Sequence, residues 1–150
     1  MEKNITYEII DPKEENIILL ENLRFDAYGI SIERIDLNSF YATSLKTGKD
    51  IAFGCFINGE LLAACYVTNT YDSLFIDQLF VKKSYQESGF QLGRKLLAYI
   101  NLNKKIIEEY FGLNFTISRL EYNSIKSKSL YEKLGYRETN SSLGIMKKAI

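Results

Sequence analysis

The sequence of 150 residues contains no histidine. This absence excludes Ser-His-Asp and Cys-His catalysis and every histidine-based metal site. The two cysteines, Cys55 and Cys65, lie within apolar runs and lack CxxC spacing, so we expect them to pack as small hydrophobic residues. Any chemistry must therefore use carboxylates, tyrosines, amines or backbone groups, and we expect no metal.

The sequence also lacks net charge and long apolar runs. Its 19 Lys and Arg residues balance 19 Asp and Glu residues, so no overall field attracts nucleic acid or an anionic membrane surface. Apolar stretches such as residues 61–65 are far shorter than the roughly 20 residues of a membrane span, and residues 1–10 lack a signal-peptide pattern. These features predict a cytoplasmic protein that binds neither nucleic acid nor membrane.

The chain has the size and hydrophobic content of one ordinary domain, expected over residues 1–150, with a single proline and no repeat or glycine-rich linker. Apolar residues at helical spacing and β-rich runs separated by turn residues define its elements. The Asn58-Gly59 pair predicts a hairpin within residues 50–70. Strands are also expected at 5–10, 73–83, 115–122 and in a final hairpin after 135, and helices at 13–28, 31–45, 90–110 and 124–135.

One stretch, YQESGFQLGRKLL at residues 85–97, reads as a glycine-containing loop between a strand and a helix. Backbone N–H groups and the helix dipole converge at such a junction and favour a phosphate group. The stretch has neither the GxxxxGK[ST] pattern of a nucleotide P-loop nor the GxGxxG pattern of a dinucleotide fold. Taken alone, it is also compatible with an ordinary helix entrance.

Two motifs together resemble the GNAT superfamily of acyl-CoA N-acyltransferases: LFVKKSYQESGFQLGRKLL at residues 79–97 and NSIKSKSLYEKLGY at residues 123–136. The second matches the family pattern Leu-Tyr-x-Lys-x-Gly-Phe/Tyr. The resemblance covers nearly the whole chain and implies an α/β (α+β) fold with a mixed, mostly antiparallel central sheet flanked by helices, in the order β-α-α-β-β-β-α-β-α-β-β. It also implies acetyl-CoA as the co-substrate of a single GNAT-like domain.

The family binds the coenzyme A pyrophosphate with a Q/R-x-x-G-x-G/A loop, and this chain departs from that pattern. One register reads Gln86, Gly89 and Gln91, with a bulky residue at the last position; the other begins two residues later and ends at Gly93. In both registers the backbone amides of residues 88–93 form the phosphate cradle. The resemblance implies a cofactor site formed by Leu79, Phe80, Val81, Gln86, Glu87, Ser88, Gly89, Phe90, Gln91, Leu92, Gly93, Asn123, Ser124 and Ser127.

Acyl transfer to an amine needs a neutral amine and a proton for the departing thiolate. The resemblance implies that Tyr131 protonates the thiolate, although a tyrosine on a short amphipathic helix is often a packing residue. Asp77 is the candidate base because it interrupts the apolar run LFIDQLFV, where burial raises a carboxyl pKa. Asp77 on a solvent-facing strand is an equal alternative, with Glu121 or a water chain as the base.

The resemblance therefore predicts an N-acetyltransferase that moves the acetyl group directly to a small primary amine, such as a polyamine, an amino acid or an amino-sugar compound. A protein or peptide amine is the alternative acceptor, and a catalytically silent acyl-CoA-binding module, favoured by Gln91, is the alternative function. A monomer or a homodimer is expected. Arg24, Tyr28 and Tyr41 lie in the helices that wall the acceptor pocket in this family, and Lys126 and Lys128 are candidates for the 3′-phosphate of coenzyme A.

Overall fold

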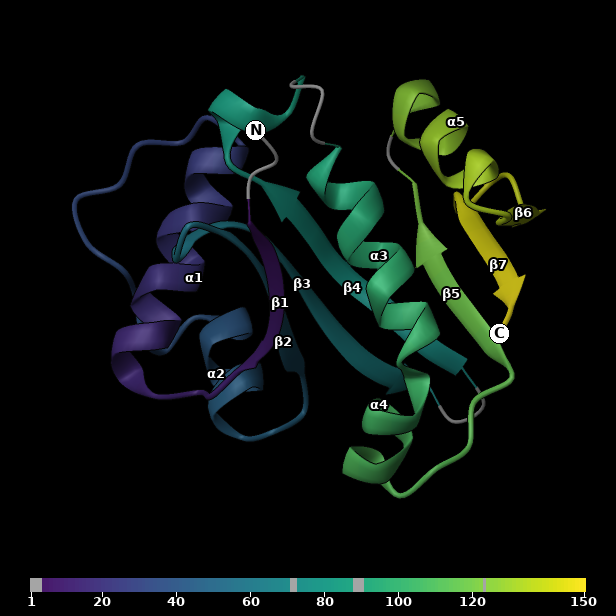
Figure 1. Ribbon diagram of the computed structural model, residues 1–150, viewed down its shortest axis with the longest axis horizontal. Helices are drawn as coiled ribbons and strands as arrows, with labels where there is room; N and C mark the ends of the chain where they lie inside the picture. Colours follow the sequence, from purple (N-terminus) through teal and green to yellow (C-terminus); the bar gives the residue numbers. More distant parts are fainter. Residues whose placement is uncertain (1–3, 71–72, 88–90, 123) are drawn as a thin grey trace.

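The computed structural model describes residues 4–70, 73–87, 91–122 and 124–150. Within these residues, one seven-stranded sheet has the strand order β1-β2-β3-β4-β5-β7-β6 (Figure 1). The strands are β1 (Ile5–Ile10), β2 (Ile51–Ile57), β3 (Glu60–Thr70), β4 (Ser73–Val81), β5 (Ile117–Glu121), β6 (Arg137–Asn140) and β7 (Ile145–Ala149). The helices are α1 (Glu14–Ala27), α2 (Phe40–Lys46), α3 (Leu92–Leu102), α4 (Lys104–Phe111) and α5 (Ile125–Lys133), with a short 3-10 turn, η1 (Lys83–Tyr85).

Neighbouring strands of the sheet are antiparallel except β4 and β5, which run parallel. Their pairing ends early, at Ile76 opposite Leu120, whereas β4 continues to Val81 paired with β3 alone. Beyond that point the two strands splay apart toward their carboxyl ends (Figure 1). The sheet is thus open between β4 and β5, and this opening positions the site.

A β-bulge marks the place where β4 leaves β5. Gln78 pairs with Tyr66 and Ile76 pairs with Val67, so Asp77 is the extra residue on β4. A bulge bends its strand and redirects the inserted side chain. The bulge therefore turns β4 away from β5 and places Asp77 at the opening.

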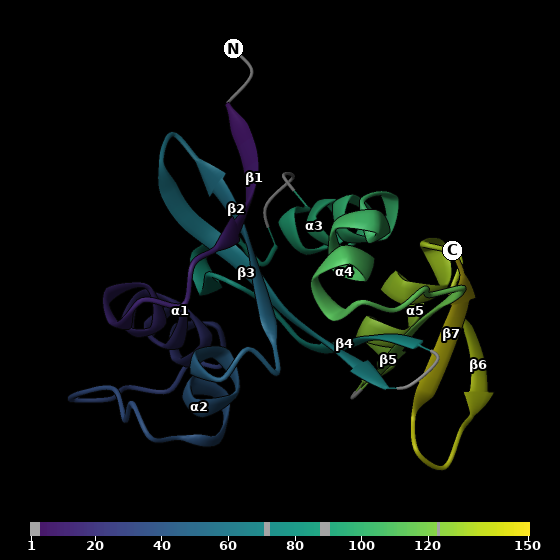
Figure 2. The same cartoon turned by 90° about the horizontal axis from the view of Figure 1, so that it is seen from below.

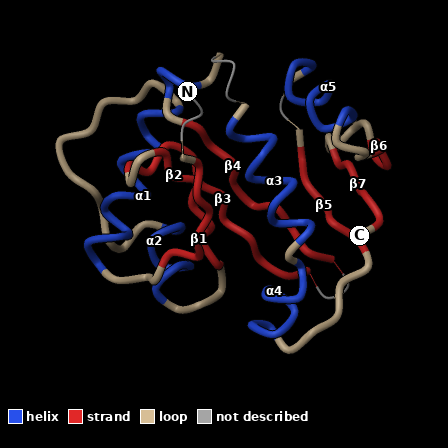
Figure 3. The backbone as a smooth tube through the Cα atoms, in the orientation of Figure 1, coloured by secondary structure: helices blue, strands red, loops and turns tan. Residues whose placement is uncertain are grey.

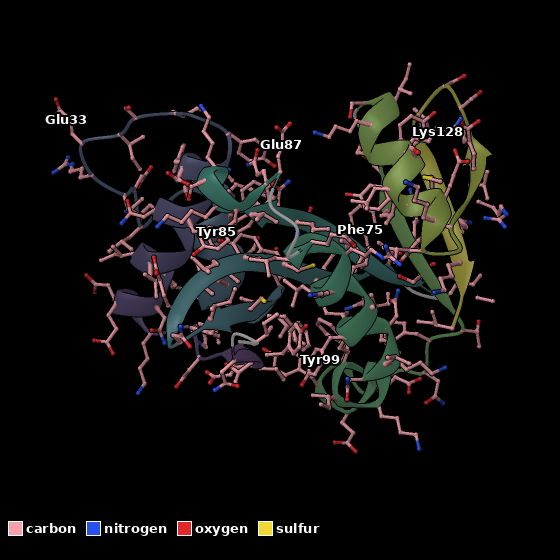
Figure 4. All side chains as sticks on the ribbon, turned by 45° about the horizontal axis from the view of Figure 1, so that its top comes forward. Glu33, Phe75, Tyr85, Glu87, Tyr99 and Lys128 are labelled. Atoms are coloured by element: carbon pink, nitrogen blue, oxygen red, sulfur yellow. The ribbon has the colours of Figure 1, made fainter. Side chains whose placement is uncertain are left out.

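Helices cover both faces of the sheet. Figure 2 shows α1 and α2 on one side of β1–β4 and α3 and α4 on the other. Each face has its own hydrophobic core: Ile17 and Leu20 of α1 pack against one, and Leu96 and Ile100 of α3 against the other. Tyr99 of α3 stacks on Tyr7 of β1 with ring centroids 4.7 Å apart and points toward that strand (Figure 4).

The predicted α+β fold with a mostly antiparallel sheet is confirmed, as are the predicted strands and hairpins. Asn58 and Gly59 both have positive φ angles, 51° and 82°, as the two-residue turn between β2 and β3 requires. The predicted third strand, 73–83, ends at Val81. The turn predicted at Tyr71-Asp72 lies outside the described residues.

Two helix predictions were wrong in their bounds. The helix expected at 31–45 begins only at Phe40, after a long loop (Figure 3), because Asn38 N–H donates to Asp36 Oδ1 in a turn and the Ser39 side chain accepts from Ala42 N–H as a helix cap. The helix expected at 90–110 is two helices, α3 and α4. They meet at Asn103, where the backbone is not helical (φ −109°, ψ 30°). The side-chain amide of Asn103 donates to Tyr99 O at 2.8 Å, a contact that competes with the helical pattern.

Candidate active site

A small cavity of about 100 Å³ lies where β4 and β5 separate. It contains the three side chains that sequence reasoning selected for proton transfer, Asp77, Glu121 and Tyr131, which come from β4, β5 and α5. The parallel pairing of β4 and β5 brings these elements together, and the bulge keeps the strands from closing over the cavity. The cavity is lined by Tyr28, Ile76, Asp77, Gln78, Leu79, Leu120, Glu121 and Tyr131.

Tyr131 reaches this cavity from α5 and is partly buried. Its ring lies edge-on to the buried ring of Tyr136, with centroids 6.2 Å apart, and this contact holds it against the core. Burial, with a smaller contribution from the Cys65 thiol, raises the pKa of the Tyr131 hydroxyl to about 12. The hydroxyl is therefore protonated at neutral pH and able to donate.

Asp77 reaches the same cavity from the bulge in β4 and is also partly buried. Burial raises the pKa of its carboxyl, and the Asp50 carboxyl and the Lys49 ammonium act in the opposite direction. A carboxyl with a raised pKa is a stronger base than an exposed aspartate. The partial burial also agrees with the alternative of Asp77 on a half-exposed strand, and the role of Asp77 as the base stays a prediction.

A hydrogen-bonded group of polar side chains lies next to Asp77 on the side of α1 and α2. The Gln78 amide links two tyrosines: its oxygen accepts from Tyr28 OH at 2.9 Å and its nitrogen donates to Tyr41 OH at 2.9 Å. The Arg24 guanidinium lies over the Tyr41 ring and forms an ion pair with the buried Glu21 at 2.8 Å. Arg24, Tyr28 and Tyr41 thus gather beside the cavity, although Arg24 is engaged with Glu21.

A larger cavity of about 620 Å³ lies on the other side of the opening, between the end of β4, the start of α3 and α5. Its charged side chains, Arg94, Lys126 and Lys133, are all basic. Seven residues of the predicted cofactor site line it: Val81, Gln86, Gln91, Leu92, Gly93, Ser124 and Ser127.

The other predicted cofactor residues lie elsewhere. Leu79 lines the small cavity. The Phe80 side chain is buried in the core on the α1–α2 face, so only the backbone of Phe80 can contact a ligand in the cavities. Glu87 pairs with Lys126 at 3.2 Å on the surface, where both side chains are more than four-fifths exposed. Ser88, Gly89, Phe90 and Asn123 lie outside the described residues.

The start of α3 combines a left-handed residue with a close helix–strand contact. Gln91, the residue before the helix, has φ 50° and ψ 50°, a conformation more common for glycine. A Cβ at Gly93 would lie 3.3 Å from Val81 Cγ2, so glycine lets α3 approach β4 closely. The first backbone N–H groups of α3 have no partner within the helix. Residues 92–94 line the cavity, so the start of the helix can serve as an anion site there.

The first turn of α5 forms the opposite wall of the larger cavity. Ser124 and Ser127 make a capping box: the Ser124 hydroxyl accepts from Ser127 N–H at 3.1 Å, and Ser124 N–H donates to Ser127 Oγ at 3.2 Å. These contacts fix the helix end and leave the hydroxyls on the cavity lining. Lys126 also faces the cavity, whereas Lys128 faces β6 and pairs with Glu138 at 3.2 Å (Figure 4).

The residues present fit coenzyme A. A helix start and basic side chains suit its phosphates, and the free edge of β4 after Ile76 offers backbone groups to an amide-containing arm. Among the described residues, no group of three or more His, Cys, Asp or Glu side chains is arranged for a metal ion. No helix in the described part of the chain has the length and apolarity needed to cross a membrane.

Sequence reasoning missed Asp50, Gln78 and Arg94. Asp50 and Gln78 belong to no motif. They lie near the cavity only because of the bulge in β4 and the pairing of elements that are distant in the sequence. Arg94 follows the loop by one residue and is a basic residue in the first turn of α3, a signal that was available in the sequence.

Comparison with known proteins identifies the family. A model described as an acetyltransferase (GNAT) domain matches residues 48–138, more than half of the chain. A sequence comparison with curated proteins gives no match.

Many solved structures share the fold, and three of them illustrate the match. The ribosomal-protein-S18-alanine N-acetyltransferase from Escherichia coli is 18% identical, with a TM-score of 0.67 over 98% of this chain and 94% of its own. The PaiA N-acetyltransferase from Thermoplasma acidophilum, in complex with coenzyme A, is 19% identical, with a TM-score of 0.67 over 98% and 99%. Aminoglycoside 6′-acetyltransferase type Ii is 16% identical, with a TM-score of 0.69 over 96% of both chains. The family match and the shared sheet lead to one conclusion: the chain belongs to the GNAT family of acetyltransferases.

Proposed function

We propose that the protein, acting as a single domain over residues 1–150, is an N-acetyltransferase that moves the acetyl group of acetyl-CoA directly to a small primary amine. The observation that carries the proposal is the cavity between β4 and β5, where a candidate base and a candidate acid meet beside a larger basic cavity. The PaiA structure, which holds coenzyme A on the same fold, supports the assignment of the cofactor.

The larger cavity would hold coenzyme A. The amides at the start of α3, with Arg94 and Lys126, would bind its phosphates, and the free edge of β4 would align its pantetheine arm. When bound, acetyl-CoA supplies the thioester whose carbonyl carbon the amine attacks. Its sulfur would then lie near Tyr131, at the inner end of the arm.

The two candidate catalytic residues divide the proton transfers. Asp77 takes a proton from the ammonium form of the acceptor, and the freed amine attacks the thioester carbonyl carbon. A C–N bond forms and the C–S bond breaks, and Tyr131 gives its hydroxyl proton to the departing sulfur. The nitrogen of the tetrahedral intermediate loses a proton that restores Tyr131, and the proton on Asp77 leaves to solvent.

The dimensions of the acceptor end favour a small amine. Tyr28 and Gln78, which are hydrogen-bonded to each other, line the cavity beside Asp77, and its volume of about 100 Å³ suits an amine on a slender chain. The carboxylates of Asp77 and Glu121 favour a cationic amine over an anionic one. The solved relatives include both a protein-directed and an aminoglycoside enzyme, so the fold alone is compatible with either acceptor.

Release of free thiol from acetyl-CoA, measured with a panel of amines, tests the proposal. Polyamines, amino acids, amino sugars and a peptide amine form the panel, and we expect turnover with at least one small amine. Turnover with the peptide alone would replace the small acceptor by a protein one. A rise in melting temperature with coenzyme A but no turnover with any amine would identify a silent binding module instead.

A further inference from the structure

Asp50 is a buried carboxyl group without an assigned role. Only 4% of the residue is exposed, and it lies between the end of α2 and the start of β2, where its N–H donates to Ser44 O at 3.0 Å. Buried carboxyl groups are rare unless they are paired or hydrogen-bonded. Asp50 therefore needs a physical reason for its position.

The neighbour of Asp50 is the candidate base. The bulge in β4 turns Asp77 toward the α1–α2 face, and the two side chains lie within hydrogen-bonding reach of each other. Two ionised carboxylates at that separation repel strongly in a poorly solvated site, whereas one shared proton makes the contact favourable.

The hydrogen-bond inventory around Asp50 agrees with a shared proton. Among the described residues, Asp50 Oδ2 is buried and accepts no hydrogen bond. The Thr68 hydroxyl also lies beside the Asp50 carboxyl, and it donates to Lys49 O at 3.0 Å. A proton between the carboxyls would give the pair the hydrogen bond that its surroundings do not supply.

Several other charged or titratable groups surround the pair. Glu121 of β5 and Tyr131 of α5 line the small cavity with Asp77, and the Tyr131 hydroxyl is neutral at physiological pH. Lys49, before β2, is exposed and favours their ionised forms, whereas the nearby Tyr66 and Cys65 of β3 and Tyr41 of α2 are neutral at physiological pH. Glu21 of α1 is neutralised by Arg24. Burial, followed by the charge of Asp77, raises the pKa of the Asp50 carboxyl to about 7.

We propose that Asp50 and Asp77 form a proton-sharing carboxyl pair that removes the proton from the acceptor amine, with Asp77 contacting the amine and Asp50 as the positioning residue behind it. This inference rests on the proposed function and names a residue that the family motifs do not contain. The ionised pair takes one proton from the ammonium, holds it between the two carboxyls, and releases it to solvent after the acetyl group has moved. A pair that binds its first proton near neutral pH is a stronger base at pH 7 than either aspartate alone.

The pair has a consequence for stability that does not depend on any acceptor. A folded-state pKa above the unfolded value of roughly 3.9 contributes stability that is complete below that value and is lost as the pH rises through about 7. The free energy of unfolding of the wild type should therefore decrease from about pH 4 to about pH 8. Asp50→Asn and Asp77→Asn should each reduce this decrease, because the charge of the neighbouring carboxyl is gone while burial still raises the pKa of the carboxyl that remains. The two reductions together should exceed the reduction in the double variant, which removes the contribution of the whole pair.

Urea unfolding across this pH range, with Glu121→Gln as the matched control, measures the effect. The control alters a carboxyl that lines the same cavity but lies outside the pair, so it should keep the wild-type decrease. If Asp50→Asn keeps the wild-type pH dependence of the free energy of unfolding, the proposed pair is wrong. It is also wrong if the reductions in the two single variants add up to the reduction in the double variant. Should Asp50→Asn fail to fold, Asp77→Asn decides alone, because its residue is only partly buried.

The pH dependence of kcat/KM tests the catalytic part. With Asp50→Asn the acid limb should move down by about one pH unit or more, because the remaining carboxyl has no partner with which to share the proton, and kcat at the plateau should fall. An unmoved acid limb would show that Asp50 does not act on the base. If no amine is turned over, the proposed function fails, whereas the unfolding experiment still decides whether the carboxyls share a proton.

Discussion

The two sides of the opening between β4 and β5 are built on different principles. The side of α3 and α5 is formed by helix ends, a strand edge and basic side chains, whereas the side of α1 and α2 is formed by two carboxyls, two tyrosines and an amide held by tertiary contacts. Backbone groups recognise a feature common to a family, such as a phosphate, and tolerate sequence change. Side chains brought together from distant elements set what is particular to one chain.

This contrast predicts that substitutions on the two sides affect different substrates. The largest difference between the effect on coenzyme A binding and the effect on amine binding is expected at Gly93, in the first turn of α3. Gly93→Glu places a carboxylate at the proposed phosphate site and should weaken coenzyme A binding at least about 100-fold, equivalent to about 3 kcal/mol. Isothermal titration with coenzyme A measures it.

The matched control is Gly93→Ala, which adds only the Cβ that would lie 3.3 Å from Val81 Cγ2. It should change the affinity by no more than about threefold, since one methyl group requires only a small shift. Equal losses in the two variants would mean that crowding rather than charge is responsible, and the phosphate site would have to be placed elsewhere.

Tyr131 lies where the two sides meet, so its removal should affect neither substrate's binding. Tyr131→Phe keeps the ring contact with Tyr136 and removes only the hydroxyl; kcat should fall about 100-fold while the melting temperature and the coenzyme A affinity stay unchanged. Burial raises the pKa of this hydroxyl to about 12, so the acid stays protonated over most of the accessible pH range. The wild-type rate should therefore stay constant up to about pH 10 and decrease only above it. Full activity of the variant at every pH would assign the acid to another group or to water.

Gln78 tests the acceptor side alone. Gln78→Leu removes the amide that joins Tyr28 and Tyr41 and should raise KM for the amine about fivefold to tenfold, the loss of about one net hydrogen bond, with an unchanged coenzyme A affinity. Steady-state kinetics with Tyr28→Phe, which removes one of these bonds, should give a smaller rise. A change in coenzyme A affinity instead would break the division between the two sides.

The smallest effect is expected for the exposed lysines of α5. Lys126→Ala should weaken coenzyme A binding about twofold to threefold at low salt and less at high salt, because the side chain is mostly solvated. Lys128→Ala is the control, since Lys128 pairs with Glu138 away from the cavity. Titrations at two salt concentrations compare them, and an equal effect of both would indicate a general field rather than a site.

The same contrast explains what the sequence could predict. The order of the elements along the chain followed from periodic apolar residues, because periodicity depends on neighbours in the chain. Two local motifs selected the residues of the proposed cofactor site in the same way. The break at Asn103 was missed because one side-chain bond to Tyr99 O outweighs a continuous helical pattern. The pairing of Asp50 with Asp77 was out of reach, since it depends on a one-residue bulge in β4 that leaves no trace in hydrophobic alternation.

One side chain ties the two halves of the site together. The Gln86 amide donates to Val81 O at the end of β4 and to Ala27 O at the end of α1, and Lys83 N–H beside it donates to Asp26 Oδ2. The segment that leads into the coenzyme loop therefore shares its anchor with the turn that carries Tyr28. Coupling between two binding sites through a shared element is reciprocal, so we expect each substrate to increase the affinity for the other by the same factor. The substrate that first fixes the hydrogen bonds of Gln86 and Lys83 should then be the one that binds first.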